Sequence, residues 1–527
     1  MRRCLAFAIA LLIVKCPCVS GGETRPNIVI ILADDMGYSD IGCYGGEIET
    51  PALDRLAADG LRFTQFYNGA RCCPTRASLL TGLFPHQTGI GGMTSDPENP
   101  DGMDQHEIGY RGFLNRQCVT MAEVLNPAGY RTLMVGKWHV GYARPELWPT
   151  ARGFDRYFGV LAGAANYFHP AGKRGLTEGD QPVEPAGDDF YLTDRFTDRA
   201  IQFVNEARND QPFFLYVAFT SPHWPLHAPA EVVAKYGGKY SQGWDELRQR
   251  RYQRMVELGI IKSKWQLPPR GGRAWDAVRP AKQADMAERM EIYAAQVDRM
   301  DQNITRLVAA LKERGQLDNT LLVFLSDNGA CAEGADLGAG KHEELNNPDA
   351  PLFVSYGRCW ANASNTPFRR YKHFTHEGGI ATPLIVHWPQ GIADRGVLRD
   401  QPSYLPDLMA TFVDVAHAQY PKEFAGNAIP PLEGVSLAGA FRNEPAPDRF
   451  MFWEHEGHRA VRHGKWKAVS LERDGQWELY NLDDDRTELH DVAADHPDVA
   501  ESLAHQWDEW SWRVHVQPYP ARAQPAP

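Results

Sequence analysis

Residues 27–35 read Asn27-Ile28-Val29-Ile30-Ile31-Leu32-Ala33-Asp34-Asp35, an uninterrupted apolar run that ends in two carboxylates. The run is rich in β-branched residues and has no polar alternation, which is typical of a strand buried on both faces of a parallel sheet. Residues 212–220 and 320–326 have the same character, and the second run is followed by Asp327-Asn328-Gly329. Polar residues therefore follow buried strands at their carboxyl ends, where parallel sheets bind their ligands.

The rest of the chain alternates between strand and helix signals. Short buried strands are expected at 131–135 and 383–388. Helices are expected at 50–59, from a Thr120 capping box onward, at 190–207 and at 284–314. This alternation predicts an α/β fold with a large, mostly parallel sheet sandwiched by helices. Residues 235–283 and 331–371 have neither signal and are expected to be long, irregular connections.

The character of the sequence changes after about residue 440. Residues 466–469 and 477–480 look like short strands, Asp474-Gly475 between them is a hairpin signal, and residues 495–513 look like a closing helix. The sequence therefore predicts a main α/β domain over residues 24–440 and a small α+β subdomain over residues 441–527.

Composition and the N-terminus limit the classes of function. The 527 residues are 43% hydrophobic, and 55 Lys+Arg against 67 Asp+Glu give a formal charge of −12. A disordered chain and a nucleic-acid-binding protein are both disfavoured. Residues 1–20 have a basic start, an apolar run over residues 4–14 and small residues, and are interpreted as a signal peptide, with an N-terminal anchor as the alternative. We therefore expect an exported chain, periplasmic or secreted, with no transmembrane segment once it is mature.

Cys72 lies in the segment Arg71-Cys72-Cys73-Pro74-Thr75-Arg76-Ala77-Ser78-Leu79-Leu80-Thr81-Gly82. Pro74 suits the first turn of a helix and Gly82 its end, so Cys72 is expected at a helix N-terminus, where free N–H groups favour an anion. Arg76 follows one turn later and can point to the same place. A nucleophile beside an anion site suits attack on a sulfate or a phosphate ester.

This segment resembles the signature of the type I sulfatases, a family within the alkaline phosphatase superfamily. The resemblance rests on Cys72-x-Pro74-x-Arg76 followed by Leu79-Leu80-Thr81-Gly82, and its spacing selects Cys72 over Cys73. It implies an alkaline phosphatase-like fold and oxidation of Cys72 to Cα-formylglycine by a formylglycine-generating or sulfatase-maturing enzyme. Leu83 and Thr75 depart from the commoner residues of the signature.

Five further segments resemble motifs of the same family in the same order. They are Asp34-Asp35-Met36-Gly37, Gly136-Lys137-Trp138-His139, Ser221-Pro222-His223-Trp224-Pro225, Ser326-Asp327-Asn328-Gly329, and Lys372 before Glu377-Gly378-Gly379. The resemblance implies one Ca2+ ion bound by Asp34, Asp35, Asp327 and Asn328. Oxygen-only ligands independently favour Ca2+ or Mg2+ over zinc.

The resemblance also implies a mechanism for hydrolysing an aryl or carbohydrate sulfate ester. One hydroxyl of the hydrated aldehyde attacks sulfur, and His223, alone or with Lys372, protonates the leaving group. His139 then takes a proton from the second hydroxyl. Arg76, Lys137 and Lys372 hold the charge of the sulfate group.

Three other functions stay open at this stage. A phosphate or phosphonate monoester hydrolase of the same superfamily can use the same motif. If Cys72 is not matured, the chain could be a non-catalytic protein that binds sulfated glycans. A cysteine thiolate hydrolase lacks a neighbouring Cys–His arrangement in the sequence. Cys73 is expected in structural packing or as an occasional disulfide partner, and His376 and His455 are left without a role.

Overall fold

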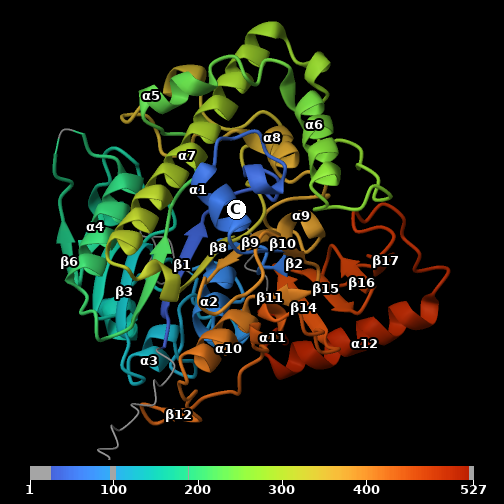
Figure 1. The fold of residues 1–527 in the computed structure, drawn as a ribbon. Helices are drawn as coiled ribbons and strands as arrows, with labels where there is room; N and C mark the ends of the chain where they lie inside the picture. Colours follow the sequence, from blue (N-terminus) through green and yellow to red (C-terminus); the bar gives the residue numbers. More distant parts are fainter. Residues whose placement is uncertain (1–24, 95–102, 188, 521–527) are drawn as a thin grey trace, which may run out of the picture.

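The computed structural model describes residues 25–94, 103–187 and 189–520, and an eleven-stranded sheet forms its centre (Figure 1). The short strand β11 (Ser403–Tyr404) pairs with β2 beside β10. The other strands lie side by side in the order β10 (Val397–Arg399), β2 (Leu61–Tyr67), β9 (Ala381–His387), β8 (Thr320–Ser326), β1 (Asn27–Ala33), β7 (Phe213–Ala218), β3 (Arg131–Lys137), β4 (Arg156–Val160), β5 (Leu176–Glu178) and β6 (Gln181–Val183).

The predicted parallel core is confirmed. Strands β8, β1, β7, β3 and β4 all run in the same direction, and every residue of β1 is buried. Strand β9 is the exception among the long strands, because it runs antiparallel to both β8 and β2. Its first residue, Ala381, therefore lies at the edge of the sheet where the parallel strands end. The segment just before β9, which carries Lys372, is brought to the same edge.

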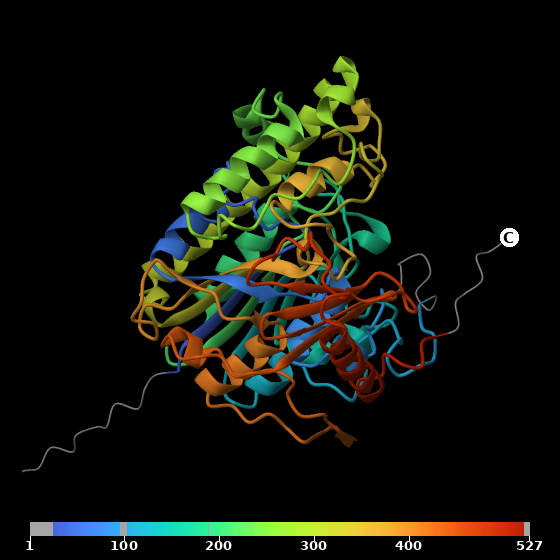
Figure 2. The same ribbon diagram turned by 90° about the vertical axis from the view of Figure 1, so that its right-hand side faces the viewer.

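Helices cover both faces of this sheet, as the sequence predicts (Figure 2). On one face, Val29 and Ile31 of β1 share a core with α1 (Pro51–Ala58), α4 (Leu192–Glu206) and α7 (Pro280–Glu313). On the other face, Ile28 and Ile30 share a core with α2 (Cys72–Thr81), α3 (Met121–Leu125) and α10 (Pro406–Val415). The Thr120 capping box is present at the start of α3, where Thr120 Oγ1 accepts from Glu123 N at 3.1 Å.

The prediction of irregular connections is wrong in two places. Helix α6 (Gly243–Glu257) and helix α8 (Gly357–Ser364) lie inside the segments expected to be irregular. The buried face of α6 includes Arg248 and Arg251, and Arg251 donates to Asp40 at 2.6 Å and to Glu47 at 2.8 Å. Arg248 donates to the carbonyl oxygen of Pro268 at 2.8 Å. Because this helix buries arginines through ion pairs and hydrogen bonds, it lacks the apolar periodicity by which helices are recognised.

The C-terminal α+β subdomain is also confirmed. A four-stranded antiparallel sheet is packed against helix α12 (Pro497–Arg513), and the turn at Asp474-Gly475 connects its last two strands. Helix α11 (Ala438–Phe441) spans the expected boundary, and the limits of the two domains stay a prediction. The strands of this sheet are β14 (Phe450–His455), β15 (His458–His463), β16 (Trp466–Ser470) and β17 (Glu478–Asn481). Apart from short 3-10 helices, the other short elements among the described residues are α5 (Ala230–Val233), α9 (Glu377–Ile380), β12 (Glu423–Phe424) and β13 (Asn427–Ala428).

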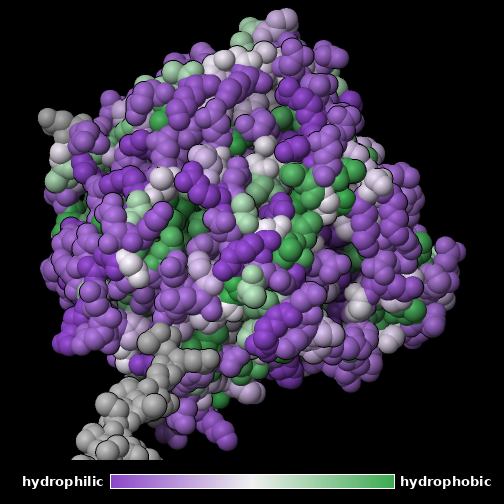
Figure 3. All heavy atoms as spheres, viewed as in Figure 1, coloured by the Kyte–Doolittle hydropathy of each residue, from purple (hydrophilic) through white to green (hydrophobic). Residues whose placement is uncertain are grey.

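The expected signal peptide, residues 1–20, lies outside the described residues. Within residues 25–94, 103–187 and 189–520, no helix is long and apolar enough to cross a membrane. The face in Figure 3 is largely hydrophilic and is interrupted by small apolar areas. The described large apolar side chains that are exposed come from separate segments: Met103, Ile108, Phe353, Val435 and Trp512.

Candidate active site

The ten residues singled out in the sequence meet at one edge of the main sheet. Strands β1, β8, β3 and β7 end at this edge. Lys137 is the last residue of β3, and the segments after β1, β8 and β7 carry Asp34, Asp327 and His223. Strand β2, which is antiparallel to β9, ends at the same edge and leads into Cys72 at the first residue of α2. The sheet therefore brings together residues that are far apart in the sequence.

Four buried side chains offer oxygen atoms at the ends of β1 and β8. The two strands are paired with Ala33 opposite Ser326, so Asp34 and Asp35 lie beside Asp327 and Asn328. The amide of Asn328 donates to Asp35 Oδ1 at 2.6 Å, which leaves Asn328 Oδ1 free to bind something else. Asn328 Oδ1 and Asp34 Oδ1 are both buried, and neither has a hydrogen-bond partner in the part of the chain that the structure describes. Unpartnered buried oxygens in a set without thiolates fit a hard divalent cation such as Ca2+.

Three cations surround these carboxylates. Lys137 Nζ lies 2.6 Å from Asp34 Oδ2, an Arg76 guanidinium nitrogen lies 2.8 Å from Asp327 Oδ2, and Lys372 Nζ lies 2.9 Å from Asp35 Oδ2. Burial raises the pKa of Asp34 and Asp327, and the neighbouring cations offset only part of that rise. At Asp35, Lys372 and His223 outweigh burial and hold the pKa below its usual range. The three cations match the three carboxylates one for one, so the observation that favours an added cation is the pair of unpartnered oxygens, Asp34 Oδ1 and Asn328 Oδ1.

Cys72 begins α2 and is only 2% exposed. The helix ends at Gly82, whose φ of 70° is the left-handed conformation expected of that stop. A hydrogen bond with Cys73 and the charge of Lys137 hold the pKa of the Cys72 thiol well below its usual range, although burial acts the other way. One turn later, Arg76 is fixed by Asp327 and by the carbonyl oxygen of Lys137, to which it donates at 3.0 Å.

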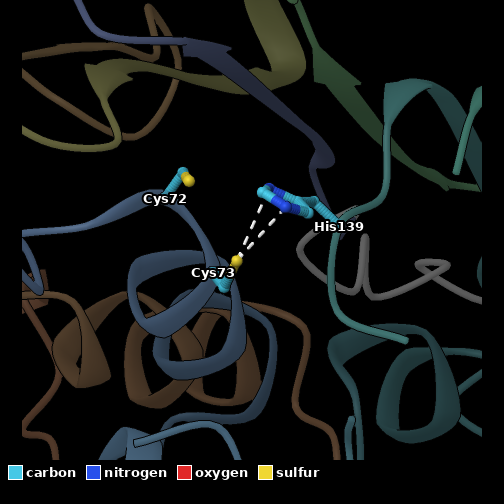
Figure 4. Close-up of side chains that lie close together, drawn as sticks. All are labelled: Cys72, Cys73 and His139. Carbon is cyan, nitrogen blue, oxygen red and sulfur yellow. Dashed lines mark hydrogen bonds between the residues drawn. The ribbon is translucent and has the colours of Figure 1, made fainter. Parts of the chain in front are cut away.

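His139 lies against Cys73 as well as beside Cys72. Its Nε2 and Nδ1 atoms lie 3.3 and 3.5 Å from Cys73 Sγ (Figure 4). Burial lowers the pKa of His139 to about 4, so its imidazole is neutral near pH 7 and can accept a proton. The φ of 56° at His139 is unusual for a residue with a side chain, as is the φ of 67° at Asp35. Cys73 is fully buried and packs against His139, a predicted site residue.

His223 lies beside the carboxylate of Asp35. Its Nδ1 is 2.7 Å from the carbonyl oxygen of Trp224, and because a carbonyl only accepts, Nδ1 carries the proton. Its Nε2 lies 3.4 Å from Asp35 Oδ2. Burial lowers the pKa of His223 to about 4. The ring therefore presents an unprotonated Nε2 to the site near neutral pH.

A cavity of about 290 Å³ opens onto these groups, and Cys72, His139, His223 and Lys372 line it. The cavity also reveals residues that sequence reasoning missed. Glu333 Oε1 lies 3.2 Å from Arg71 and 3.5 Å from Lys372, and Glu333 Oε2 accepts from Trp224 Nε1 at 2.8 Å. Glu333 lies in an expected irregular segment, so no pattern pointed to it. The other missed lining residues are Arg71, Met93, Thr94, Met103, Gly163, Ala164, Arg174 and Trp224.

Solved structures with this architecture are similar over nearly the whole chain. The crystal structure of Ps i-CgsB in complex with k-i-k-neocarrahexaose has a TM-score of 0.69 and 27% identity, covering 95% of this chain and 96% of its own. The phosphonate monoester hydrolase of Agrobacterium radiobacter has a TM-score of 0.57 and 17% identity over 93% and 96% of the two chains, a likeness of fold alone. The protein is therefore an α/β protein of the alkaline phosphatase-like fold class.

Sequence comparison narrows this class to a family. The family model described as Sulfatase matches residues 26–418, and the model described as N-sulphoglucosamine sulphohydrolase, C-terminal, matches residues 369–511. The chain belongs to the sulfatase family and is a sulfuric ester hydrolase.

Three relatives show how far the similarity extends. An uncharacterized sulfatase of Schizosaccharomyces pombe is 35% identical over 92% of this chain and 93% of its own. An arylsulfatase of Klebsiella aerogenes is 35% identical over 83% and 96% of the two chains. The N-acetylgalactosamine-6-sulfatase of Homo sapiens is 28% identical over 88% and 74%. The relatives thus span both the main domain and the C-terminal subdomain.

Proposed function

We propose that this sulfatase hydrolyses aryl or carbohydrate sulfate esters with a nucleophile made from Cys72 and a Ca2+ ion held by Asp34, Asp35, Asp327 and Asn328. One observation carries the proposal: Cys72 lies at a helix N-terminus in a cavity that Lys372, His139 and His223 also line, next to those four oxygen-bearing side chains. An anionic ester group entering the cavity would meet the nucleophile, the cations and two neutral imidazoles together.

The metal part of the proposal is supported by the chemistry of the four side chains. They offer hard oxygen ligands, and two of the oxygens are buried without partners. When bound, Ca2+ would neutralise charge on the sulfate oxygens and make the sulfur easier to attack. Lys137 and Lys372 form ion pairs with Asp34 and Asp35, so these carboxylates are held in place independently of the metal ion.

The nucleophile part is supported by position. The signature spacing and the start of α2 both select Cys72, which lies next to Lys137, Arg76 and His139. Conversion to formylglycine supplies a hydrated aldehyde with two hydroxyl groups. Helix N–H groups at this position favour the negative charge that such a nucleophile develops. We propose that a formylglycine-generating or sulfatase-maturing enzyme carries out this conversion.

The remaining residues either bind the charged sulfate group or transfer protons during the reaction. Arg76, Lys137 and Lys372 hold the sulfate group and the charge that moves across it. His139, which is neutral near pH 7, accepts a proton on the side of Cys72. Lys372, whose ammonium group lies 2.9 Å from Asp35 Oδ2, is placed to return a proton to the departing alcohol. His223 Nε2, 3.4 Å from the same oxygen, shares this role once it has taken up a proton.

Both substrate classes are supported by relatives. One relative is named an arylsulfatase and another an N-acetylgalactosamine-6-sulfatase, while the similar Ps i-CgsB was solved with k-i-k-neocarrahexaose. Trp224 lines the cavity, and its ring packs edge-on against the exposed Phe353 at a centroid distance of 5.1 Å. Such an aromatic pair can pack against either an aryl group or the apolar face of a sugar.

The deciding experiment compares turnover of an aryl sulfate and the matching aryl phosphate by protein whose Cys72 peptide has been characterised by mass spectrometry. We expect conversion of Cys72 and a dominant sulfatase rate. A dominant phosphatase rate would favour the phosphate or phosphonate monoester hydrolase. Binding of sulfated glycans without turnover, by protein that retains only the thiol after expression in its native host, would favour the non-catalytic alternative.

We also propose export of the chain, directed by residues 1–20. The support is the basic start and the short apolar run of those residues. Fractionation of the native host, followed by N-terminal sequencing of the mature protein, tests this proposal. An intact N-terminus in the cytoplasmic fraction would contradict it.

A further inference from the structure

Sulfur and imidazole side chains from three separate segments meet beside the candidate nucleophile. Cys72 and Cys73 begin α2, His139 follows β3, and Met93 comes from the segment after α2. One ligand atom from each of Cys72, Cys73 and His139 lies within 4.8 Å of the others. Cys73 Sγ also lies 3.9 Å from Met93 Sδ. Figure 4 shows the two cysteines and the imidazole facing one another.

We propose that the chain, while Cys72 is still a thiol, binds one Cu(I) ion through Cys72, Cys73 and His139, with Met93 as a weaker fourth ligand. Thiolate and thioether sulfur are soft ligands, and together with imidazole they favour Cu(I). Zinc takes thiolate and imidazole ligands but makes little use of a thioether. The presence of Met93 therefore favours Cu(I) over Zn2+. Ca2+ has no suitable oxygen set among these four side chains.

The ion can reach this cluster from the cavity. Cys72, Met93 and His139 line the cavity of about 290 Å³, while Cys73 is fully buried behind them. Among the described residues neither cysteine has a disulfide partner, and Cys73 has no part in the proposed hydrolysis. The neutral imidazole of His139 has a lone pair available on one nitrogen, which is the form that binds a metal.

The chemistry of binding balances without a redox partner. Cu(I) binds both sulfurs as thiolates: two copper–sulfur bonds form, and each proton still carried by Cys72 or Cys73 goes to solvent. Copper keeps its oxidation state, and the bound ion with its two thiolates carries one negative charge. Lys137 and Arg76 lie close enough to Cys72 to compensate that charge.

The inference rests on the proposed function at one point only. Oxidation of Cys72 to formylglycine removes one of the two thiolates, so the matured protein should lose the copper site. Conversely, copper held by Cys72 occupies the sulfur that maturation must oxidise. Soft-metal capture and maturation therefore compete for the same atom.

The test uses the full chain produced without a maturing enzyme, with the Cys72 thiol verified by mass spectrometry. Anaerobic titration with Cu(I) buffered by a chromophoric chelator should give one tightly bound ion. Substituting Cys72→Ser or Cys73→Ser should weaken binding by more than the roughly 10–100-fold typical of losing an outer-shell partner. The substitution Met93→Leu should weaken Cu(I) binding by about tenfold and leave Zn2+ binding unchanged.

A control variant, a folding measurement and the matured protein show whether a change in Cu(I) affinity is due to the proposed ligands. Cys359→Ser, which removes a thiol that contacts the Arg273 carbonyl, is the matched control and should bind Cu(I) as the parent does. Circular dichroism verifies that each variant is folded, and Met93→Leu provides a second route if a cysteine variant is not. Matured protein should bind Cu(I) at least as weakly as Cys72→Ser.

Equal Cu(I) affinity in the parent and in a Cys72→Ala/Cys73→Ala double variant would overturn the inference. Tighter binding of Zn2+ than of Cu(I), with no effect of Met93→Leu, would overturn the assignment to copper. Failure of the proposed function would be seen separately, because the aryl sulfate assay uses matured protein without copper.

Discussion

Lys137 Nζ lies 2.6 Å from Asp34 Oδ2, and both side chains are fully buried. The pair connects the ends of β3 and β1, which β7 separates in the sheet. It neutralises one oxygen of Asp34 and leaves the other, Oδ1, buried without a partner. The same pattern recurs at Asn328, whose amide nitrogen is bonded and whose oxygen is not.

This arrangement predicts that Ca2+ stabilises the folded protein. A ligand that binds only the folded state adds about 2.7 kcal/mol to the free energy of unfolding at 100 times its dissociation constant. We expect a chelator to remove both this increment and the sulfatase activity, and added Ca2+ to restore both. Chemical denaturation with and without Ca2+ measures the increment.

The matched variants are Asp327→Asn and Asp349→Asn. The first changes a buried carboxylate of the proposed set and should abolish the Ca2+ increment, whereas the second changes an exposed one and should keep it. An unchanged increment in Asp327→Asn would mean that the ion binds elsewhere.

Substituting each cysteine in turn should show that Cys72, and not Cys73, is needed for activity. We expect Cys72→Ala to lower kcat by at least about 10⁴-fold, in the range of other nucleophile deletions, without unfolding the protein. Cys73→Ala should keep most of the activity, because Cys73 has no part in the proposed reaction and removing its sulfur takes away a packing contact with His139. Steady-state kinetics on an aryl sulfate, with a thermal melt of each variant, provides the comparison. A dead Cys73→Ala with an active Cys72→Ala would reverse the assignment of the nucleophile.

Much of this site could be predicted from the sequence because local residue patterns indicate where strands end and where helices begin. The apolar run over residues 27–33 identifies a buried strand, and the residues after it must then lie at the sheet edge. Pro74 and Gly82 delimit α2 in the same way. The family resemblance added Lys372, which neither a strand end nor a helix start would have selected.

Other features depend on contacts between distant segments, which no local pattern reports. The reversed direction of β9 follows from its pairing with β2 and β8. Glu333 becomes a site residue only because the chain folds back over Arg71 and Lys372. The contact of Cys73 with Met93 and His139 likewise needs three segments to meet.

His227 provides a test of how burial controls stability in acid. Burial lowers its pKa from 6.5 to about 4, and its Nε2 lies 3.1 Å from the Asn347 carbonyl oxygen. Between pH 6.5 and 4 the unfolded chain therefore binds a proton that the folded chain does not, so stability falls as the pH falls. The effect on the free energy of unfolding reaches up to about 3 kcal/mol below pH 4.

The substitution His227→Gln removes the titrating ring and keeps a donor for the carbonyl group. We expect its free energy of unfolding to fall less steeply than that of the parent between pH 6.5 and 4. Urea denaturation at several pH values measures both slopes, and His505→Gln on the exposed face of α12 is the control. Parallel slopes in parent and His227→Gln would show that another group is responsible.

Lys467 connects the C-terminal subdomain to the segment that carries Lys372. Its Nζ lies 2.9 Å from Glu377 and 2.8 Å from Glu488, and all three side chains are fully buried. Arg486 also bonds Glu377, at 2.8 Å. Because Lys467→Met leaves Glu488 buried without its cation, we expect a loss of about 3–5 kcal/mol in the free energy of unfolding.

Lys465 is exposed, and Lys465→Met should change the free energy of unfolding by no more than about 0.5 kcal/mol. Denaturant titration measures the free energy of unfolding of both variants. Equal losses in the two variants would mean that the buried ion pairs do not hold the subdomain to the sheet.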